Sequence, residues 1–196
     1  MKTKTLAVII TFASLAIVLN PAISGIGVPF PFLPTLIFQI WEIPTVVALL
    51  LFGFKTGLPV AVINSVFLVT VYPGMSRPLY GIGSFFSVTS MMVGFILVYR
   101  FLARGNLQDN RFETRAKAVA ISISAAILFR VAVMALYMYI DLSFLTYPPI
   151  TSSRLFSIVL PFQAVFNIII PLYMLPAGYA VARLISRNLK VGGNLV

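Results

Sequence analysis

The chain of 196 residues contains no cysteine and no histidine, and it carries only four carboxylates. Without cysteine there is no disulfide and no thiolate nucleophile, and without both residues there is no His- or Cys-based zinc site. Ser-His catalysis is excluded because the chain has no histidine. The four acids are Glu42, Asp109, Glu113 and Asp141. This inventory weighs against an enzyme, so we predict no catalytic residue, no metal and no cofactor.

Charge is also scarce: 9% of the residues are charged, 60% are hydrophobic, and the mean hydropathy is +1.05. A soluble domain of this size needs far more charge to cover its surface, so the solvent around this chain is membrane lipid. The net charge of +10 comes from basic residues at the ends of apolar runs. They form no basic stripe with interleaved aromatics, so we predict no nucleic-acid partner.

Long apolar runs separated by proline and glycine predict an all-α integral membrane protein, with one six-helix transmembrane domain over residues 1–196. The six predicted transmembrane helices are about 5–23, 35–54, 58–72, 80–101, 117–140 and 155–185. The segment 21–34, rich in proline and glycine, is predicted to be a loop, and 53–57 a tight turn. The basic, apolar N-terminus also resembles a signal peptide, but Ala22-Ile23-Ser24 is a weak cleavage site and we take the first helix as retained.

The basic residues predict the orientation of these helices. With the N-terminus inside the cell, the inner side receives Lys2, Lys4, Lys55, Arg100, Arg104, Arg111, Arg115, Lys117, Arg183, Arg187 and Lys190. The outer side receives only Arg77 and Arg154, and Arg130 lies within a helix. Both termini are therefore predicted to be cytoplasmic.

Small residues recur at helical spacing in four of the predicted helices, which is typical of close helix contacts in lipid. These stripes are Thr3, Ala7, Thr11 and Ser14; Gly57, Ala61 and Ser65; Ala118, Ser122 and Ala126; and Gly178 and Ala182. The spacing fits packing within one bundle, and it equally fits a face that docks another protein.

Arg130 lies near the middle of the fifth predicted helix, where an arginine costs roughly 2.5 to 3.5 kcal/mol on insertion scales. It therefore needs a partner, and Glu42 is the acid within the second predicted helix. One interpretation is a buried pair that fixes helix order; the other is that Arg130 binds an anionic or carbonyl group of a ligand. The two overlap if the pair lines a cavity.

Other polar side chains gather in the outer half of the predicted bundle. Gln163 and Asn167 are four residues apart and so share one helix face, and Asn64 lies in the third helix. These amides suit hydrogen-bonding ligands but also join helices. Trp41 is either an interfacial residue or a stacking platform for an aromatic ligand. With Tyr137, this distribution predicts a cavity open to the outside and closed below, a capture site rather than a pore.

Several short motifs, in order along the chain, resemble the substrate-binding S components of the energy-coupling factor (ECF) transporters. The resemblance covers the family's basic start and small-residue first helix, the loop after that helix, a hydrophobic–acidic–Ile-Pro signature and a Gly-x3-Gly turn. In the last helix, Leu-Pro-Phe-Gln resembles the family's Leu-Pro-Phe-Asn. The segments that carry the resemblance are Lys4–Ala16, Pro29–Pro34, Ile40–Pro44, Leu51–Gly57 and Leu160–Gln163.

The resemblance implies a subunit that binds a small-molecule vitamin and joins a membrane T component and two cytoplasmic ATPases. It would hydrolyse nothing itself, and the sequence has no Gly-x4-Gly-Lys-Ser/Thr phosphate loop. The resemblance also implies that Ala7, Thr11 and Ser14 contact the T component.

The last motif is closest to riboflavin-type members, which makes riboflavin the leading candidate substrate. Gln163 stands where those members carry asparagine, and Phe166 stands where they carry lysine. A flat ring would stack on Trp41 and Phe166. The alternative function is a structural or assembly subunit that binds no small molecule, in which case the polar side chains only join helices.

Overall fold

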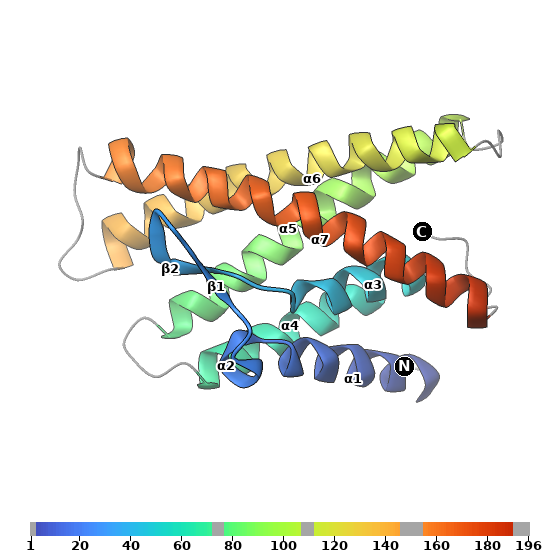
Figure 1. Cartoon of the computed structure of the whole chain (residues 1–196), viewed down its shortest axis with the longest axis horizontal. Coiled ribbons are helices and arrows are strands. Elements are labelled where there is room, and N and C mark those ends of the chain that lie inside the picture. The colour runs from blue at the N-terminus through green and yellow to red at the C-terminus, as the bar shows by residue number, and fades with distance from the viewer. Residues whose placement is uncertain (1–2, 72–76, 107–111, 146–154, 190–196) are drawn as a thin grey trace.

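The computed structural model describes residues 3–71, 77–106, 112–145 and 155–189, and most of them are helical (Figure 1). Within these residues, four helices are long and apolar enough to cross a membrane. They are α4 (Phe54–Val71), α5 (Arg77–Asn106), α6 (Phe112–Ile140) and α7 (Leu160–Leu189). Each overlaps most of one of the last four predicted transmembrane helices. Two π-helical turns, η1 (Asp141–Leu145) and η2 (Leu155–Val159), extend α6 and precede α7, and η2 holds the first residues of the predicted last helix.

The first two predicted transmembrane helices are shorter than predicted. The helix α1 (Thr3–Val18) has 16 residues and α3 (Glu42–Phe52) has 11. Since a full crossing needs roughly 20 residues, neither reaches that length by itself. All six predicted segments therefore contain helix, but only four of the described helices have spanning length.

A β-hairpin occupies residues 28–38, where a loop followed by helix was predicted. Its strands β1 (Val28–Phe30) and β2 (Leu33–Phe38) pair antiparallel, with Val28 opposite Phe38. Hydropathy led the prediction to extend the second helix back to residue 35, because a short apolar run fits strand and helix equally well. The nearby prolines and the β-branched Thr35 and Ile37 favour the extended form. A short helix, α2 (Pro21–Ser24), precedes the hairpin.

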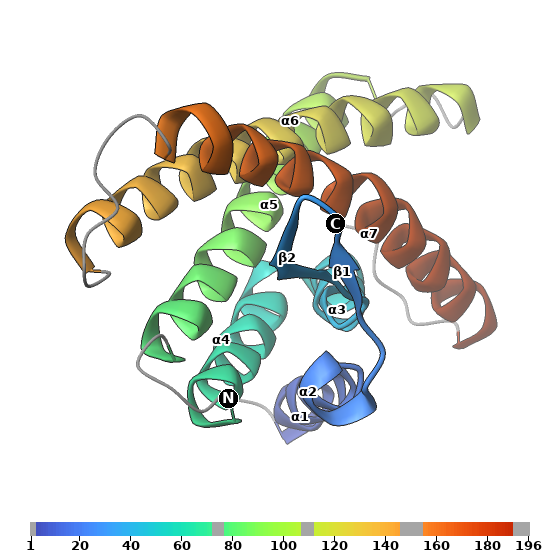
Figure 2. The ribbon, with the colours of Figure 1, turned by 60° about the vertical axis from the view of Figure 1, so that its left-hand side comes forward.

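The helix α3 lies at the centre of the bundle. It contacts α1, α4, α5 and α7, and Figure 2 shows it enclosed between them. Nine of its 11 residues are buried, as expected for a helix that is apolar on every side. Pro44 lies in its first turn, where a missing N–H costs no helical bond. Gly53, at φ 82°, ends the helix as the predicted turn requires.

Prolines also mark the last helix. Pro171 and Pro176 lie inside α7, and Pro161 lies in its first turn.

Three of the four small-residue stripes face the inside of the bundle. The stripes of α4, α6 and α7 are buried, and the helices approach closely beside them. A Cβ on Gly178 would lie 2.5 Å from Val46 of α3, and one on Gly94 of α5 would lie 2.9 Å from the Ala125 carbonyl of α6. In the stripe of α1, by contrast, Ala7, Thr11 and Ser14 are exposed.

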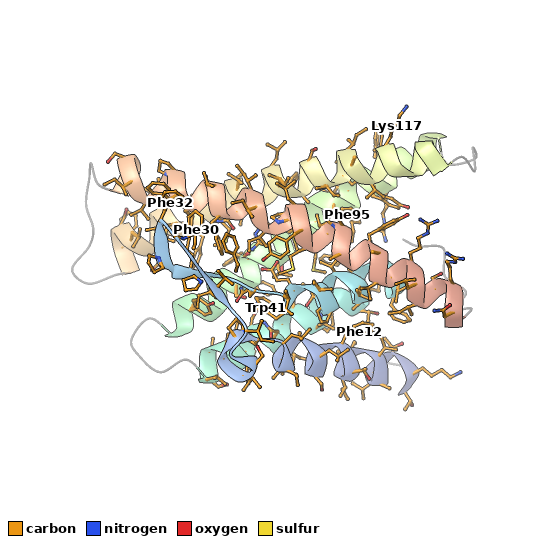
Figure 3. The ribbon with its side chains drawn as sticks, in the orientation of Figure 1. Phe12, Phe30, Phe32, Trp41, Phe95 and Lys117 are labelled. Atoms are coloured by element: carbon orange, nitrogen blue, oxygen red, sulfur yellow. The ribbon has the colours of Figure 1, made fainter. Side chains whose placement is uncertain are left out.

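The two ends of the bundle differ in charge. Eight of the ten basic residues of the described helices lie toward the end where α1 begins and α7 ends, marked by Lys117 in Figure 3. These residues are Lys4, Lys55, Arg100, Arg104, Arg115, Lys117, Arg183 and Arg187. The hairpin lies toward the other end, where α5 begins with Arg77 (Figure 1). Lys2, Arg111, Arg154 and Lys190 lie outside the described residues.

Candidate ligand-binding site

Arg130 of α6 is buried, with 2% of its surface exposed, and forms a two-pronged ion pair with Glu42. Its Nη1 donates to Glu42 Oε2 at 2.6 Å, and its Nη2 donates to Glu42 Oε1 at 2.9 Å. The Glu42 side chain, 1% exposed, lies in the first turn of α3. Paired in this geometry, the two charges satisfy each other inside the bundle, where either charge alone would be very costly.

Two further contacts join Arg130 to the neighbouring helices. Its Nε donates to Asn167 Oδ1 of α7 at 3.0 Å, and Nη1 lies 3.5 Å from the Met91 sulfur of α5. Residues from α3, α5, α6 and α7 therefore meet at one guanidinium. The close approach of α5 and α6 at Gly94, one turn from Met91, brings the two helices together here.

The side chain of Asn167 is engaged at both ends. Its oxygen accepts from Arg130, and its Nδ2 donates to the Gln163 main-chain carbonyl at 2.9 Å. The Gln163 side chain is different: it is 2% exposed, and its Oε1 has no hydrogen-bond partner. Asn167 thus holds Arg130 in place, whereas Gln163 keeps an amide oxygen available.

A cavity of about 210 Å³ opens beside this pair. Its walls come from β2, from the segment between β2 and α3, and from α3, α5, α6, η1 and α7. Six of the eight predicted binding residues line it: Glu42, Arg130, Tyr137, Gln163, Phe166 and Asn167. Met134 and Asp141 also line the cavity, and their helical spacing puts them on the same side of α6 and η1 as Arg130 and Tyr137.

Trp41 and Asn64 are buried outside this lining. Trp41, 1% exposed, belongs to an apolar cluster with Ala61 and Leu68 of α4, and its Nε1 has no partner. Asn64 lies between those two residues on α4, is fully buried, and has no partner for either polar atom. Both residues therefore flank the site on the α4 side instead of forming its wall.

Besides Met134 and Asp141, eight of the residues that line the cavity were not among the predicted binding residues. Those missed are Leu36, Ile37, Gln39, Tyr80, Gly83, Ser84, Ser87 and Met138. The serines of α5 read as ordinary helix-packing residues, and Gln39 fell inside a segment predicted to be helix. The useful signal was the spacing of Gly83 and Ser87, four residues apart and so on the same face of α5 as the cavity.

Aromatic rings attach the hairpin to α7 above the cavity. Phe166 lies 5.6 Å from Phe30 and 5.2 Å from Phe38, measured between ring centroids. Phe32 stacks on Phe162 at 4.8 Å with the ring planes 6° apart; Figure 3 labels Phe30 and Phe32 on the hairpin. The hydroxyl of Tyr173 also donates to the Gln39 carbonyl at 2.9 Å. The hairpin is therefore a packed wall of the site.

No group of acidic side chains in the described ranges is arranged to hold a metal ion. The polar floor of the cavity consists of the Glu42–Arg130 ion pair and the amides of Gln163 and Asn167. Much of the remaining wall is apolar or aromatic. Such a surface can bind a small molecule through hydrogen bonds and ring contacts.

Four long apolar helices and a partly open cavity with buried polar residues at its base define the class as a multi-pass membrane protein with a candidate binding site. The chain is similar to the solved S component of a bacterial ECF transporter, with a TM-score of 0.72 and 20% identity. The match covers 97% of this chain and 99% of that chain. No protein-family model and no curated protein sequence matches it. The predicted location, a multi-pass protein of the cell membrane, is confirmed.

Proposed function

We propose that this chain is the substrate-binding subunit of an ATP-driven importer of the ECF type, and that it captures a vitamin or a similar micronutrient. The observation that carries the proposal is a fold shared with an S component over nearly the whole length of both chains. The cavity beside Arg130 supports it, because the similar fold here encloses space for a small molecule.

The orientation in this proposal follows the charge. The basic ends of the described helices face the cytoplasm, so the cavity opens toward the outside and both termini lie inside. This is the direction in which an importer has to capture its substrate.

The partners in this proposal are a membrane T component and two cytoplasmic ATPases, which supply the energy. The exposed stripe of Ala7, Thr11 and Ser14 is the surface that contacts the T component. Small side chains let another helix approach the α1 backbone closely. The chain itself catalyses no reaction.

Riboflavin is the leading candidate substrate. Phe166, at the cavity wall and 7% exposed, offers a ring for stacking, and Gln163 and Tyr137 offer hydrogen bonds. Glu42, Arg130 and Asn167 form the floor, with Trp41 and Asn64 packed beside it. The cavity volume lies below the roughly 300 Å³ at which ligand pockets usually begin, so a flavin would have to occupy the mouth as well.

The direct test is to purify the protein in mild detergent, denature it, and identify any released small molecule by absorbance and mass spectrometry. We expect a stoichiometric vitamin, with a flavin recognised by its yellow colour. Phe166→Ala should release its ligand during purification, whereas Phe101→Ala, at a side chain 80% exposed to the surroundings, should retain it. An empty protein that also fails to respond to a vitamin panel in thermal-shift assays would reject the proposal.

The second candidate is a structural or assembly subunit that binds no small molecule. The saturated contacts of Arg130 favour it, because they bind four helices to one another without any ligand. Under this alternative, Gln163→Leu leaves every property of the protein unchanged except a small gain in thermal stability, since it removes a buried amide oxygen without a partner.

A further inference from the structure

The floor of the cavity carries no net charge. Glu42 and Arg130 engage each other through both carboxylate oxygens and both terminal guanidinium nitrogens, and Asn167 takes the third nitrogen. A charged ligand group beside this pair would be a third, unpaired charge in a buried environment, which is strongly unfavourable. An acidic ligand beside Arg130 would share that one cation with Glu42, so one of the two negative charges would be left without a counter-charge.

The polar atoms of the cavity lining that lack partners are all oxygens able to accept a hydrogen bond. Gln39 Oε1, Ser84 Oγ and Gln163 Oε1 each have no hydrogen-bond partner, and their side chains come from three different elements. Two are amide oxygens, which only accept, and the third is a hydroxyl, which both accepts and donates. The lining therefore offers hydrogen-bond acceptors, and a ligand that fits it should supply the donors.

Gln163 is the most buried of the three and is adjacent to the ion pair through Asn167. A primary amide presents an acceptor and a donor side by side, so its complement is a group with an N–H next to a carbonyl or ring nitrogen. Apolar side chains such as Ile37, Met134 and Phe166 line the same cavity, which suits the flat faces of a ring.

Asp141 is the remaining charged group in the lining. It is partly exposed in η1, and lies 11 residues along the chain from Arg130, roughly 16 Å at 1.5 Å per helical residue. A positive group on the ligand could reach Asp141 near the mouth of the cavity. Beside Gln163, however, the charged residues are Glu42 and Arg130, which neutralise each other. These two residues therefore determine that the part of the ligand bound beside Gln163 is uncharged.

We infer that the site selects an uncharged ring with an amide-like edge, and that Gln163 is the specificity-determining residue that hydrogen-bonds this edge. This inference rests on the proposed function, because it assumes that the cavity holds a small-molecule substrate.

The test uses small probes that share a ring and differ in charge. Nicotinamide is neutral with an amide edge, nicotinate replaces the amide by a carboxylate, and 1-methylnicotinamide keeps the amide on a cationic ring. Uracil and its carboxylate orotate form a second pair. Binding is measured by ligand-observed NMR on purified protein in detergent, with empty micelles as the blank.

We expect nicotinamide and uracil to bind at least about 30-fold more tightly than the charged probes, because a buried unpaired charge costs several kcal/mol. Gln163→Leu should weaken the neutral probes about tenfold. Gln163→Glu should invert the order, so that 1-methylnicotinamide exceeds nicotinamide. Val165→Leu is the matched control on the outer side of α7, 43% exposed, and should change neither value.

The outcomes separate the inference from the proposed function. Tighter binding of nicotinate, orotate or 1-methylnicotinamide to the unmodified protein would overturn the inference and leave a binding subunit in place. If no probe binds, the charge of the ligand released on denaturation decides: a neutral ring supports the inference, and a charged one overturns it. No released ligand and no probe binding would reject the proposed function, and the inference with it.

Discussion

The small-residue stripes of α6 and α1 look alike in sequence and lie in opposite environments. In α6, Ser122 and Ala126 are fully buried against α5, whereas in α1 Ala7 and Thr11 are exposed. The spacing of small residues therefore identifies a face suited to close helix approach, but not whether the approaching helix belongs to the same chain. The bundle's own packing explains the α6 stripe and leaves the α1 stripe without a contact inside the described protein.

The hydroxyl groups of the two stripes make the comparison sharper. Ser122 donates to the Ala118 carbonyl at 2.7 Å, and Thr11 donates to the Ala7 carbonyl at 2.9 Å. Each hydroxyl bonds its own helix one turn back, so neither stripe joins helices through hydrogen bonds. The two stripes therefore differ only in packing. Four substitutions compare buried positions with the exposed stripe, and they follow in order of their expected effect on the free energy of unfolding.

The largest effect is expected one turn beyond Ala126, at Arg130. Arg130→Ala leaves Glu42 buried without its cation and should destabilise the protein by about 3 to 5 kcal/mol, measured by thermal or denaturant unfolding in detergent. The double variant E42Q/R130Q removes both charges and should recover much of the loss. A loss below about 1 kcal/mol for Arg130→Ala would contradict the buried pair.

A smaller loss is expected within the buried stripe. Ala126→Leu adds volume where a Cβ on Gly94 would already lie 3.0 Å from the Ala126 backbone, and overpacking of this kind costs about 1 to 3 kcal/mol. The same unfolding measurement applies. Leu128→Ala, on the opposite face and 69% exposed, is the control and should change stability little.

The third substitution should stabilise the protein. Asn64 lies on the buried face of α4, and neither atom of its amide has a partner, so it carries a desolvation penalty without a compensating bond. Asn64→Leu should raise the free energy of unfolding by about 1 kcal/mol, read as a higher melting temperature in detergent. A clear loss of stability would mean that Asn64 is engaged by a group absent from the chain, such as an ordered water.

The smallest effect on stability is expected in the exposed stripe. Replacing Ala7 and Thr11 with leucine should change the free energy of unfolding by no more than about 0.5 kcal/mol, because neither side chain is packed. Under the proposed function, the same variant should no longer co-purify with the T component and the ATPases, while ligand binding is kept. Unchanged co-purification would show that α1 is not the docking face.

Much of the fold follows from sequence because lipid makes hydropathy informative. The four long helices, the turn at Gly53 and the presence of a partner acid for Arg130 were all predictable, since a buried arginine needs a countercharge and the chain has few acids. The hairpin at 28–38 was not, because an apolar strand and an apolar helix have the same hydropathy. That error also moved the predicted start of the second helix away from Glu42.

The site was predictable by residue type more than by role. Polar side chains inside predicted helices identified Gln163 and Asn167, but the sequence could not show that one amide is saturated and the other is not. Trp41 and Asn64 looked equally suitable, yet both are buried outside the cavity lining. Ser84 was missed because serine is common on packed helices, and Gln39 was missed because it fell near the start of a predicted helix, where a polar residue is ordinary.

The central position of α3 has a thermodynamic consequence. Its first turn supplies Glu42 to the cavity lining, and its later turns pack against α1, so one helix of 11 residues contacts both the cavity and the helix with the exposed stripe. If a ligand shifts α3 relative to α1, it changes the affinity of α1 for a docked protein. Reciprocity then requires that protein to change the ligand's affinity by the same factor, so loading and release would share one coupling free energy.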